Sequence, residues 1–255
     1  MKRIVALLLV FVLASLLLSV AVSAEPEQEA QVTIFLTRHG KTLFNTEHRV
    51  QGWCDTPLTE DGITVAENLG LGLKDAGITF DAAYSSDLGR QRDTARLVLD
   101  NLGLTEMDVR ENRGLRETCF GSWEGELESV RDAAYCEIAG TESVYEIYPQ
   151  GSLFQDITVQ TDTTGMAESL ETAQTRFLAA LNEIAETAIA NGEKNVLVVS
   201  SGGIINTIIP LLGGEGAELK NASVTMLYYN NGEFTLGVVG DMSYADRGAE
   251  LRVEE

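Results

Sequence analysis

Cysteine and histidine, which bind metals such as zinc, are scarce in this chain of 255 residues, with three cysteines and two histidines. Its three cysteines, Cys54, Cys119 and Cys136, form no CxxC pair and no spacing typical of zinc ligands. Because their number is odd, at least one thiol has no partner within the chain, and we expect three free or partly buried thiols. No group of carboxylates or histidines suggests a Mg²⁺ or Zn²⁺ site. We therefore expect neither a metal nor a cofactor.

Basic residues are also few, since 18 lysines and arginines stand against 39 aspartates and glutamates, giving a net charge of -21. So acidic a composition argues against nucleic acid or anionic lipid as a partner, because both carry negative charge. We interpret the acidity as a solvated surface, and it names no substrate.

The first 24 residues differ from the rest of the chain and have the three-part pattern of a secretory signal. Lys2 and Arg3 precede the apolar run Ile4–Val20, and the small residues 21–24 would form a cleavage site. Loss of residues 1–24 would remove two positive charges and move the net charge from -21 to -23. A polar segment, residues 25–31, follows.

An uncleaved membrane anchor over residues 4–22 is the rival interpretation, because a membrane span needs about 20 apolar residues and this run is only slightly shorter. No cysteine follows the run, so a lipoprotein anchor is not expected. Either way we expect an exported, extracytoplasmic protein, secreted after cleavage and membrane-bound only if the segment stays.

Strands and helices are expected to alternate over residues 32–240, which we take as one domain. Short β-branched and apolar runs predict the strands, and apolar residues at three- and four-residue steps predict the helices. We expect strands at 32–37, 82–85, 195–200, 223–229 and 234–239, and helices at 59–75, 88–101, 126–139, 167–191 and 203–212. Thr59 should cap the first helix, and Ser86 or Asp87 the second.

This order predicts an α/β fold with a mostly parallel sheet sandwiched by helices. Outside the helix at 126–139, the middle of the chain, residues 111–166, is rich in Gly, Ser, Thr and Asp and should be irregular. Residues 241–255 are left as a C-terminal tail.

Ligands of such sheets bind beyond the carboxyl ends of the strands. Arg38-His39-Gly40 follows the first predicted strand, and Ser201-Gly202-Gly203 follows the strand at 195–200. A guanidinium presents a planar fork that suits phosphate, and a neutral imidazole nitrogen can attack phosphorus. An isolated Arg-His pair would be weak evidence for such a site, but the pattern continues along the chain.

Two segments carry a recognisable signature: LTRHGKTLFN at residues 36–45 and QGWCDTPLT at residues 51–59. Further matches follow in order, with SSDLGR at 85–90, LRE at 115–117, FGSWEG at 120–125 and ES at 168–169. Together they resemble the histidine phosphatase superfamily in its phosphoglycerate-mutase-like branch, over roughly residues 32–240. The resemblance implies a phosphoglycerate-mutase-like fold and a phosphorylated small molecule or phosphorylated partner as ligand.

The resemblance also implies a role for each matched residue. His39 would be the nucleophile that forms a phosphohistidine, with Arg38 and Arg90 clamping the phosphoryl oxygens and Asn45 as a further donor. Glu117 would protonate the leaving oxygen and later help to activate water. Two guanidiniums can neutralise a transferring phosphoryl group without a metal.

The same resemblance implies that Gln51 and Gly52 contact substrate. Trp53 and Phe120 are expected to pack rather than to bind ligand. Gln91 follows Arg90 where the family usually has Ala, and we expect this change to have little effect.

One position departs from the family at its centre, because Ser201 stands where the family has a second catalytic histidine. Loss of such a donor typically costs about 10²–10³ in rate. The chain's one other histidine, His48, lies in a neighbouring loop and is a possible substitute. Ser201 could instead cap the following helix, with Gly202 and the first helical amides forming an anion cradle.

The leading hypothesis is an exported, metal-independent phosphatase that acts on phosphomonoesters and is slow or specialised because of Ser201. The alternative is a non-catalytic relative that binds a phosphorylated ligand or partner through Arg38, Arg90 and Asn45. A true phosphoglycerate mutase is the less favoured interpretation, because export and the missing histidine both speak against it.

Overall fold

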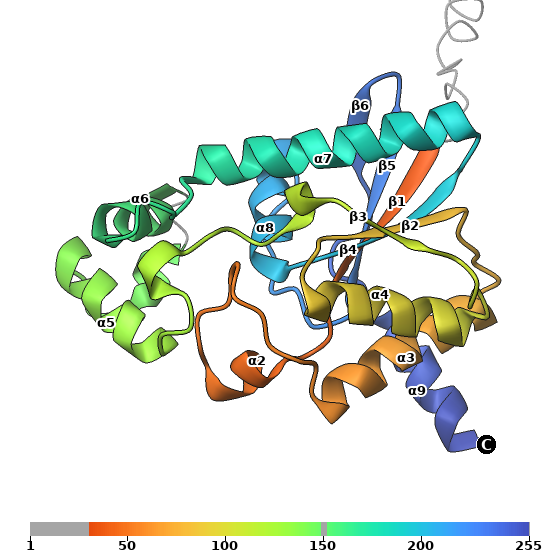
Figure 1. Cartoon of the computed structure of the whole chain (residues 1–255), viewed down its shortest axis with the longest axis horizontal. Coiled ribbons are helices and arrows are strands. Elements are labelled where there is room, and N and C mark those ends of the chain that lie inside the picture. Colours follow the sequence, from red (N-terminus) through yellow and green to blue (C-terminus); the bar gives the residue numbers. More distant parts are fainter. Residues whose placement is uncertain (1–30, 149–151, 255) are drawn as a thin grey trace, which may run out of the picture. The chain divides into compact units, whose positions relative to one another are not determined.

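A six-stranded mixed sheet forms the centre of the fold (Figure 1). The computed structural model describes residues 31–148 and 152–254, so the expected signal and most of the polar segment that follows it lie outside the described residues. The strands are β1 (Val32–Arg38), β2 (Ala82–Ser85), β3 (Val109–Glu111), β4 (Asn195–Ser200), β5 (Val224–Asn230) and β6 (Glu233–Leu236), in the order β3-β2-β4-β1-β5-β6.

Four neighbouring strands of this sheet are parallel. β1 pairs with β4, β4 with β2 and β2 with β3, whereas β5 runs antiparallel to β1 and β6 antiparallel to β5. The carboxyl ends of β1, β4 and β2 therefore lie at one edge of the sheet, and the register aligns Arg38 with Ser200. The prediction of an α/β fold with a mostly parallel sheet is confirmed.

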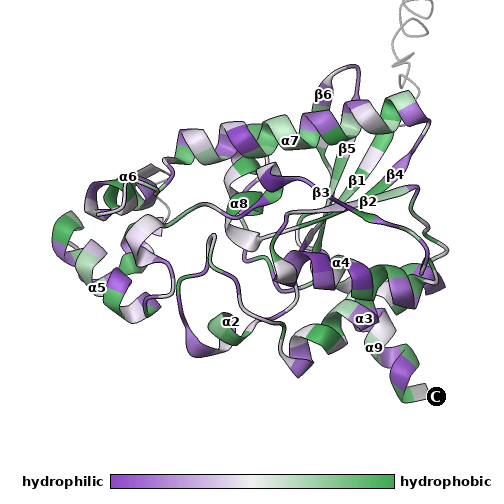
Figure 2. Cartoon of the chain, viewed as in Figure 1, coloured by the Kyte–Doolittle hydropathy of each residue, from purple (hydrophilic) through white to green (hydrophobic). Residues whose placement is uncertain are grey.

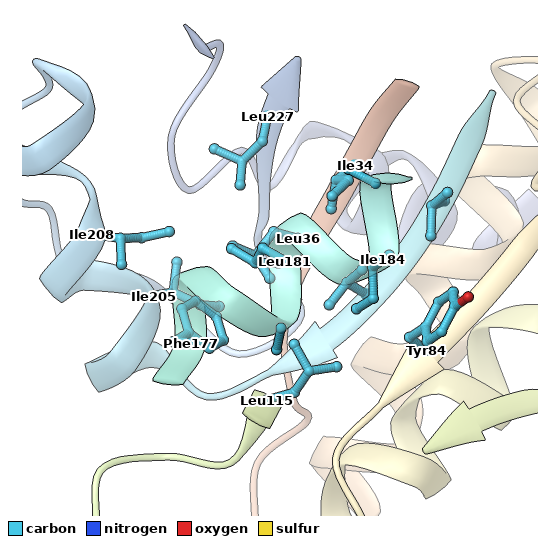
Figure 3. Packing of buried hydrophobic residues seen from close by; sticks show 14 of the residues in the cluster. Ile34, Leu36, Tyr84, Leu115, Phe177, Leu181, Ile184, Ile205, Ile208 and Leu227 are labelled. Carbon is cyan, nitrogen blue, oxygen red and sulfur yellow. The ribbon is translucent and has the colours of Figure 1, made fainter. Parts of the chain in front are cut away.

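Helices α7 (Leu170–Asn191) and α8 (Gly202–Ile208) cover one face of the sheet. Phe177, Leu181 and Ile184 recur at three- and four-residue steps along α7 and pack, fully buried, against strand residues such as Ile34 and Leu36 (Figure 3). Hydrophilic residues occupy the turns of α7 between them (Figure 2). This apolar face accounts for the periodicity seen in the sequence.

The other face of the sheet is covered by α3 (Glu60–Asp75), α4 (Gly89–Leu102) and α9 (Ser243–Glu254). The side chain of Thr59 caps α3 by accepting from the amide of Gly62 at 3.1 Å, as predicted. For α4 the cap position is Leu88, whose amide donates to the Ser86 hydroxyl at 3.1 Å. Ser86 thus accepts from the start of α4 but lies two residues before the cap position, where Ser86 or Asp87 was expected.

The segment 241–255, expected as a tail, forms α9 over Ser243–Glu254 and packs on α3. The reason is close backbone contact: Gly72 of α3 faces the carbonyl of Tyr244, and Gly248 of α9 faces that of Asn68, with no room for a Cβ at either glycine. Ala245 is buried between the two helices and the sheet. The positions of these small residues in the sequence did not indicate that the two helices would pack against each other.

The middle of the chain is more regular than expected. Besides α5 (Glu128–Ala139), it contains α6 (Ser152–Thr161) and single 3₁₀ turns at Arg113–Leu115, Gly121–Trp123 and Val144–Glu146. Helices α5 and α6 share a small core of their own, formed by Tyr135, Val144, Ile147 and Ile157. No helix within the described residues is long and apolar enough to cross a membrane.

The close contact of α3 with α9 yields a stability prediction. Gly248→Ala should destabilise the protein by about 1–3 kcal/mol, because the added methyl group overlaps the carbonyl of Asn68. Helix propensity alone would predict the opposite, because it favours Ala over Gly by about 1 kcal/mol in a helix interior. Urea unfolding checks it, with Ala249→Ser as a control that adds one atom at an exposed position of the same helix. A stabilising Gly248→Ala would contradict the packing.

Candidate active site

His39 and Ser201 lie side by side because they follow the aligned ends of β1 and β4. The amide of His39 donates to the carbonyl of Ser200 at 2.9 Å, which extends the pairing one residue beyond the strands. Asn221 holds the other side of this turn by donating to the carbonyl of His39 at 2.8 Å. The two loops that sequence topology singled out are thereby brought together.

The imidazole of His39 is buried and held in one tautomer. Its Nδ1 lies 2.7 Å from the carbonyl oxygen of Gly40, which can only accept, so Nδ1 carries the proton and Nε2 keeps its lone pair. Burial lowers the pKa of His39 well below 6.5, and the positive charges of Arg90 and Arg38 lower it further. The ring is therefore neutral and nucleophilic at physiological pH.

Arg90 is fully buried and held by the loop that follows His39. Its terminal nitrogens donate to the carbonyls of Gly52 at 2.7 Å and Cys54 at 2.8 Å, and to the carboxylate of Asp55 at 3.0 Å. The Nε of Arg90 and the Nε of Arg38 are buried and have no hydrogen-bond partner among the described residues. Buried donors of this kind require an acceptor, and the oxygens of a bound anion would supply it.

Glu117 is buried at the same edge of the sheet, with 6% of its surface exposed. Its two carboxyl oxygens accept from the amides of Thr118 and Gly203, each at 2.8 Å. Burial raises the pKa of Glu117 above its ordinary value, although these amides and the charge of Arg90 act in the opposite direction. A carboxyl group shifted this way keeps its proton to higher pH and can act as a general acid.

Glu124 organises the loop that holds Arg90, a role that the sequence motif did not reveal. Its carboxylate accepts from the amides of Gly52, Trp53 and Cys54 at 3.0, 2.8 and 2.9 Å, and from the amide of Phe120 at 3.0 Å. These bonds turn the carbonyls of the loop towards the guanidinium of Arg90. The position of Glu124 within FGSWEG was the one available signal.

A second ion pair supports the segment that carries Glu117. Glu168 accepts from both sides of the Arg176 guanidinium at 2.8 and 2.7 Å, and from the amide of Cys119 at 2.9 Å. Arg176 also donates to the carbonyls of Arg116 and Glu117. Glu168 of the matched ES pair thus supports the segment that carries Glu117, and Ser169 caps α7.

Three residues expected to contact substrate take part in internal hydrogen bonds. Asn45 and Thr42 cap one short helix reciprocally, which engages the side-chain oxygen of Asn45 and leaves its amide donor group. Gln51 accepts from the Thr42 hydroxyl at 2.6 Å and donates to Thr56 at 2.9 Å. Gly52 serves through its carbonyl, as the acceptor for Arg90.

His48 does not substitute for the missing histidine. Its side chain is 82% exposed, and its Nδ1 lies 3.9 Å from a carboxylate oxygen of Glu128. Its backbone is left-handed, with φ 53°. An exposed loop histidine cannot complete a buried site.

Ser201 begins α8 but its side chain makes no capping hydrogen bond. The amide of Gly203, in the first turn of α8, donates to the carboxyl group of Glu117. The Ser201 hydroxyl instead accepts from Nε2 of Gln91 at 2.7 Å and from Arg90 at 3.5 Å. Gln91, the second position that differs from the signature, therefore contacts Ser201 directly, which the sequence alone did not indicate. Gly202 packs beside Arg38, and a Cβ there would lie 2.9 Å from Cδ of that side chain.

A cleft leads away from Glu117 and Gly203. It consists of a cavity of about 320 Å³ that contains Glu117 and a wider one of about 940 Å³, and the two share lining residues, namely Tyr148, Leu170, Gly203, Asn206 and Thr207. Within the described lining, Arg131 is the one lysine or arginine. The described residues contain no group of three or more His, Cys, Asp or Glu placed to hold a metal, and the three cysteines are unpaired.

Comparison with known proteins agrees with this geometry. The profile of the Histidine phosphatase superfamily (branch 1) matches residues 34–242. A 2,3-bisphosphoglycerate-dependent phosphoglycerate mutase from Allorhizobium ampelinum is 31% identical over 228 residues, covering 84% of this chain and 98% of the relative.

Solved structures give the same picture. The crystal structure of a phosphoglycerate mutase from Bacillus anthracis str. Sterne superposes with a TM-score of 0.81 at 42% identity, covering 86% of this chain and 96% of that one. A protein of Escherichia coli str. K-12, provisionally described as an alpha-ribazole-5'-P phosphatase, gives a TM-score of 0.61 at 26% identity, with coverages of 83% and 97%.

The state of His39 can be measured directly because the chain has two histidines. In a His48→Asn variant, which tolerates the left-handed backbone, the remaining imidazole should show the Nδ1–H tautomer. Its titration midpoint should lie below 6.5, because burial and two arginines disfavour the charged form. Nitrogen-15 NMR across pH checks both. A midpoint at or above 6.5, or the opposite tautomer, would contradict the site.

Proposed function

Because this chain belongs to the histidine phosphatase superfamily, we propose that it is a metal-independent phosphomonoesterase that works through a phosphohistidine at His39. One observation carries the proposal: a neutral, buried imidazole, protonated at Nδ1, lies within the electrostatic influence of two guanidiniums, and their buried Nε donors have no partner among the described residues. This arrangement suits a phosphoryl group better than any neutral ligand.

The reaction follows in two steps from these positions. Nε2 of His39 attacks phosphorus, the bond to the ester oxygen breaks, and the proton of Glu117 passes to that oxygen, so that an alcohol leaves. Water then attacks the phosphorus of the phosphohistidine, and a proton of this water passes to the Glu117 carboxylate. The bond from phosphorus to Nε2 breaks, which releases inorganic phosphate and restores the neutral imidazole of His39. Arg38 and Arg90 neutralise the phosphoryl oxygens in both steps, with the Asn45 amide as a further donor.

Phosphoglycerate mutase activity is the second candidate, because the relatives described above bear that name. A phosphoglycerate carries a carboxylate beside its phosphate, and binding it calls for a free cation in the cleft. Arg131, the cation of the described lining, is 5% exposed and donates twice to Asp132, at 2.9 and 2.7 Å. This pairing supports a phosphatase over a mutase.

We also propose that the protein is exported and acts on a phosphorylated small molecule outside the cytoplasm. The support is the signal-like composition of residues 1–24 and the acidity of the chain. The intact mass of the extracytoplasmic protein tests this: a chain beginning at Glu25 indicates cleavage, a full-length one an anchor, and absence from that compartment rules the proposal out.

The catalytic proposal predicts a contrast between the two histidines. His39→Asn should abolish turnover of an aryl phosphate, because no nucleophile remains, whereas His48→Asn should keep it. Wild-type turnover should survive dialysis against EDTA, because two guanidiniums supply the charge neutralisation. Phosphate binding without turnover in the wild-type protein would favour the non-catalytic alternative. Rescue of an EDTA-treated enzyme by a divalent ion would overturn the mechanism.

A further inference from the structure

The cleft beside Glu117 has a charge pattern that selects among substrates. Glu128 lines the smaller cavity and Glu218 the larger one. Burial lowers the pKa of Arg38, and the negative charges of Glu117, Glu218 and Glu128 act in the opposite direction. The smaller cavity also contains Glu117, so Glu128 lies on the side of the proposed leaving alcohol, and Glu218 lines the adjoining cavity. A second acidic group on the substrate would meet two like charges there.

The cleft also contains a neutral acceptor, the side-chain oxygen of Gln155, and a neutral donor, the side-chain amide of Asn206, whose own oxygen accepts from the amide of Ala217. Gln155 is 8% exposed, and its side-chain oxygen is buried without a hydrogen-bond partner among the described residues. The rings of Tyr148 and Phe154 line the same cavity. Arg131 contributes no free charge, since it pairs with Asp132, donates to Tyr148 at 3.3 Å and lies 5.1 Å from the ring of Phe154.

Resting on the proposed phosphatase function, we propose that the preferred substrate is the phosphate ester of an amine-bearing alcohol. An ammonium group would donate to the Gln155 oxygen, be attracted by Glu128 and Glu218, and lie near aromatic rings, which favour cations. The apolar lining, with Leu170, would contact the carbon chain.

Three small esters of matched size test this inference: 2-aminoethyl, 2-hydroxyethyl and carboxymethyl phosphate. We expect kcat/KM for the aminoethyl ester to exceed that of the carboxymethyl ester by at least about tenfold at low salt, with the neutral ester between them. The ratio should fall as salt is added, because both carboxylates are accessible to solvent. In Glu128→Gln/Glu218→Gln the preference should collapse.

A matched control variant neutralises the same number of carboxylates at positions that do not line the cleft. Glu137→Gln/Glu215→Gln neutralises one exposed residue of α5 and one of the loop before Glu218, and should keep the preference. Equal kcat/KM for the three esters, or a preference that the cleft variant retains, would overturn the substrate class while leaving the phosphatase proposal intact. Failure of the proposed function itself would appear as no turnover of any ester, the aryl phosphate included.

A separate observation concerns the hydroxyl of Ser201. Gln91 and Ser201 are both buried, and the amide of Ser86 donates to Oε1 of Gln91 at 3.2 Å. This bond fixes the side-chain amide of Gln91 so that Nε2 must face Ser201 as a donor. The Ser201 oxygen thus receives donors from Gln91 and Arg90, and among the described residues its own proton has no acceptor.

We infer that Gln91 is a positioning residue, which turns the Ser201 proton towards the phosphoryl group in place of a histidine donor. A hydroxyl whose lone pairs are occupied by donors can present its proton only in the remaining direction. The two departures from the family signature therefore act as one unit. The same contact means that a bulkier ring at 201 would collide with Gln91.

A double-mutant cycle tests this role, with Gln91→Glu as a nearly isosteric variant that can only accept from Ser201. Gln91→Glu and Ser201→Ala should each lower kcat by about tenfold or more, with a smaller change in KM, because an aligned phosphoryl donor is lost. Their combination should be no worse than Ser201→Ala. Multiplied effects in folded variants, or full activity in Gln91→Glu, would overturn the inference.

Replacement by histidine gives an independent check. Ser201→His alone should lower turnover, since Gln91 occupies the adjacent space. Gln91→Ala/Ser201→His should be faster than Gln91→Ala, and this gain should vanish when His39 is also replaced. A gain from Ser201→His alone would show that Gln91 does not restrict the position.

Discussion

The fully buried guanidinium of Arg90 is the constraint on which the rest of the site depends. A buried charge is tolerated only when hydrogen bonds and an opposite charge compensate it. The carbonyls of Gly52 and Cys54 and the carboxylate of Asp55 do this. They are in place because Glu124 gathers the amides of the same loop. Arg90 thereby orders the loop at residues 52–55, which is distant in sequence. The Nε of Arg90 stays available to donate to an anion.

Burial lowers the pKa of His39 and raises that of Glu117, the two groups that react in the proposed mechanism. Burial and two guanidiniums keep His39 neutral and able to attack, while burial helps Glu117 to retain the proton that the leaving oxygen needs. The proposed reaction needs a neutral His39 and a protonated Glu117, and each pKa shift favours the required state. The hydrogen bond from Gln91 to Ser201 fits this pattern. In the proposed role the Ser201 hydroxyl is a neutral donor, at a position where a third positive charge would be repelled by Arg38 and Arg90.

Features of the fold and site that depend on local sequence patterns or on the ends of strands could be predicted from the sequence. The strand at 195–200, the Thr59 cap and the position of His39 at the end of β1 follow from periodicity, capping and topology. Contacts between distant segments could not be predicted this way. Gln91 meets Ser201 across 110 positions, Glu124 meets Gly52 across 72, and α9 packs on α3 through glycines whose spacing has no helical signature. Gln51, expected at the substrate, is engaged by Thr42 and Thr56 of the same loop region, and the motif does not show how its side chain is used.

The central claim is covalent transfer to His39, and trapping the intermediate tests it most directly. The enzyme would be mixed with a phosphorus-labelled ester, quenched within the first turnover and digested for peptide mapping. The account predicts an acid-labile, base-stable phosphate on the peptide that contains His39, formed and lost at rates that match turnover. Product formation without label on the protein, or label on another residue, would contradict it.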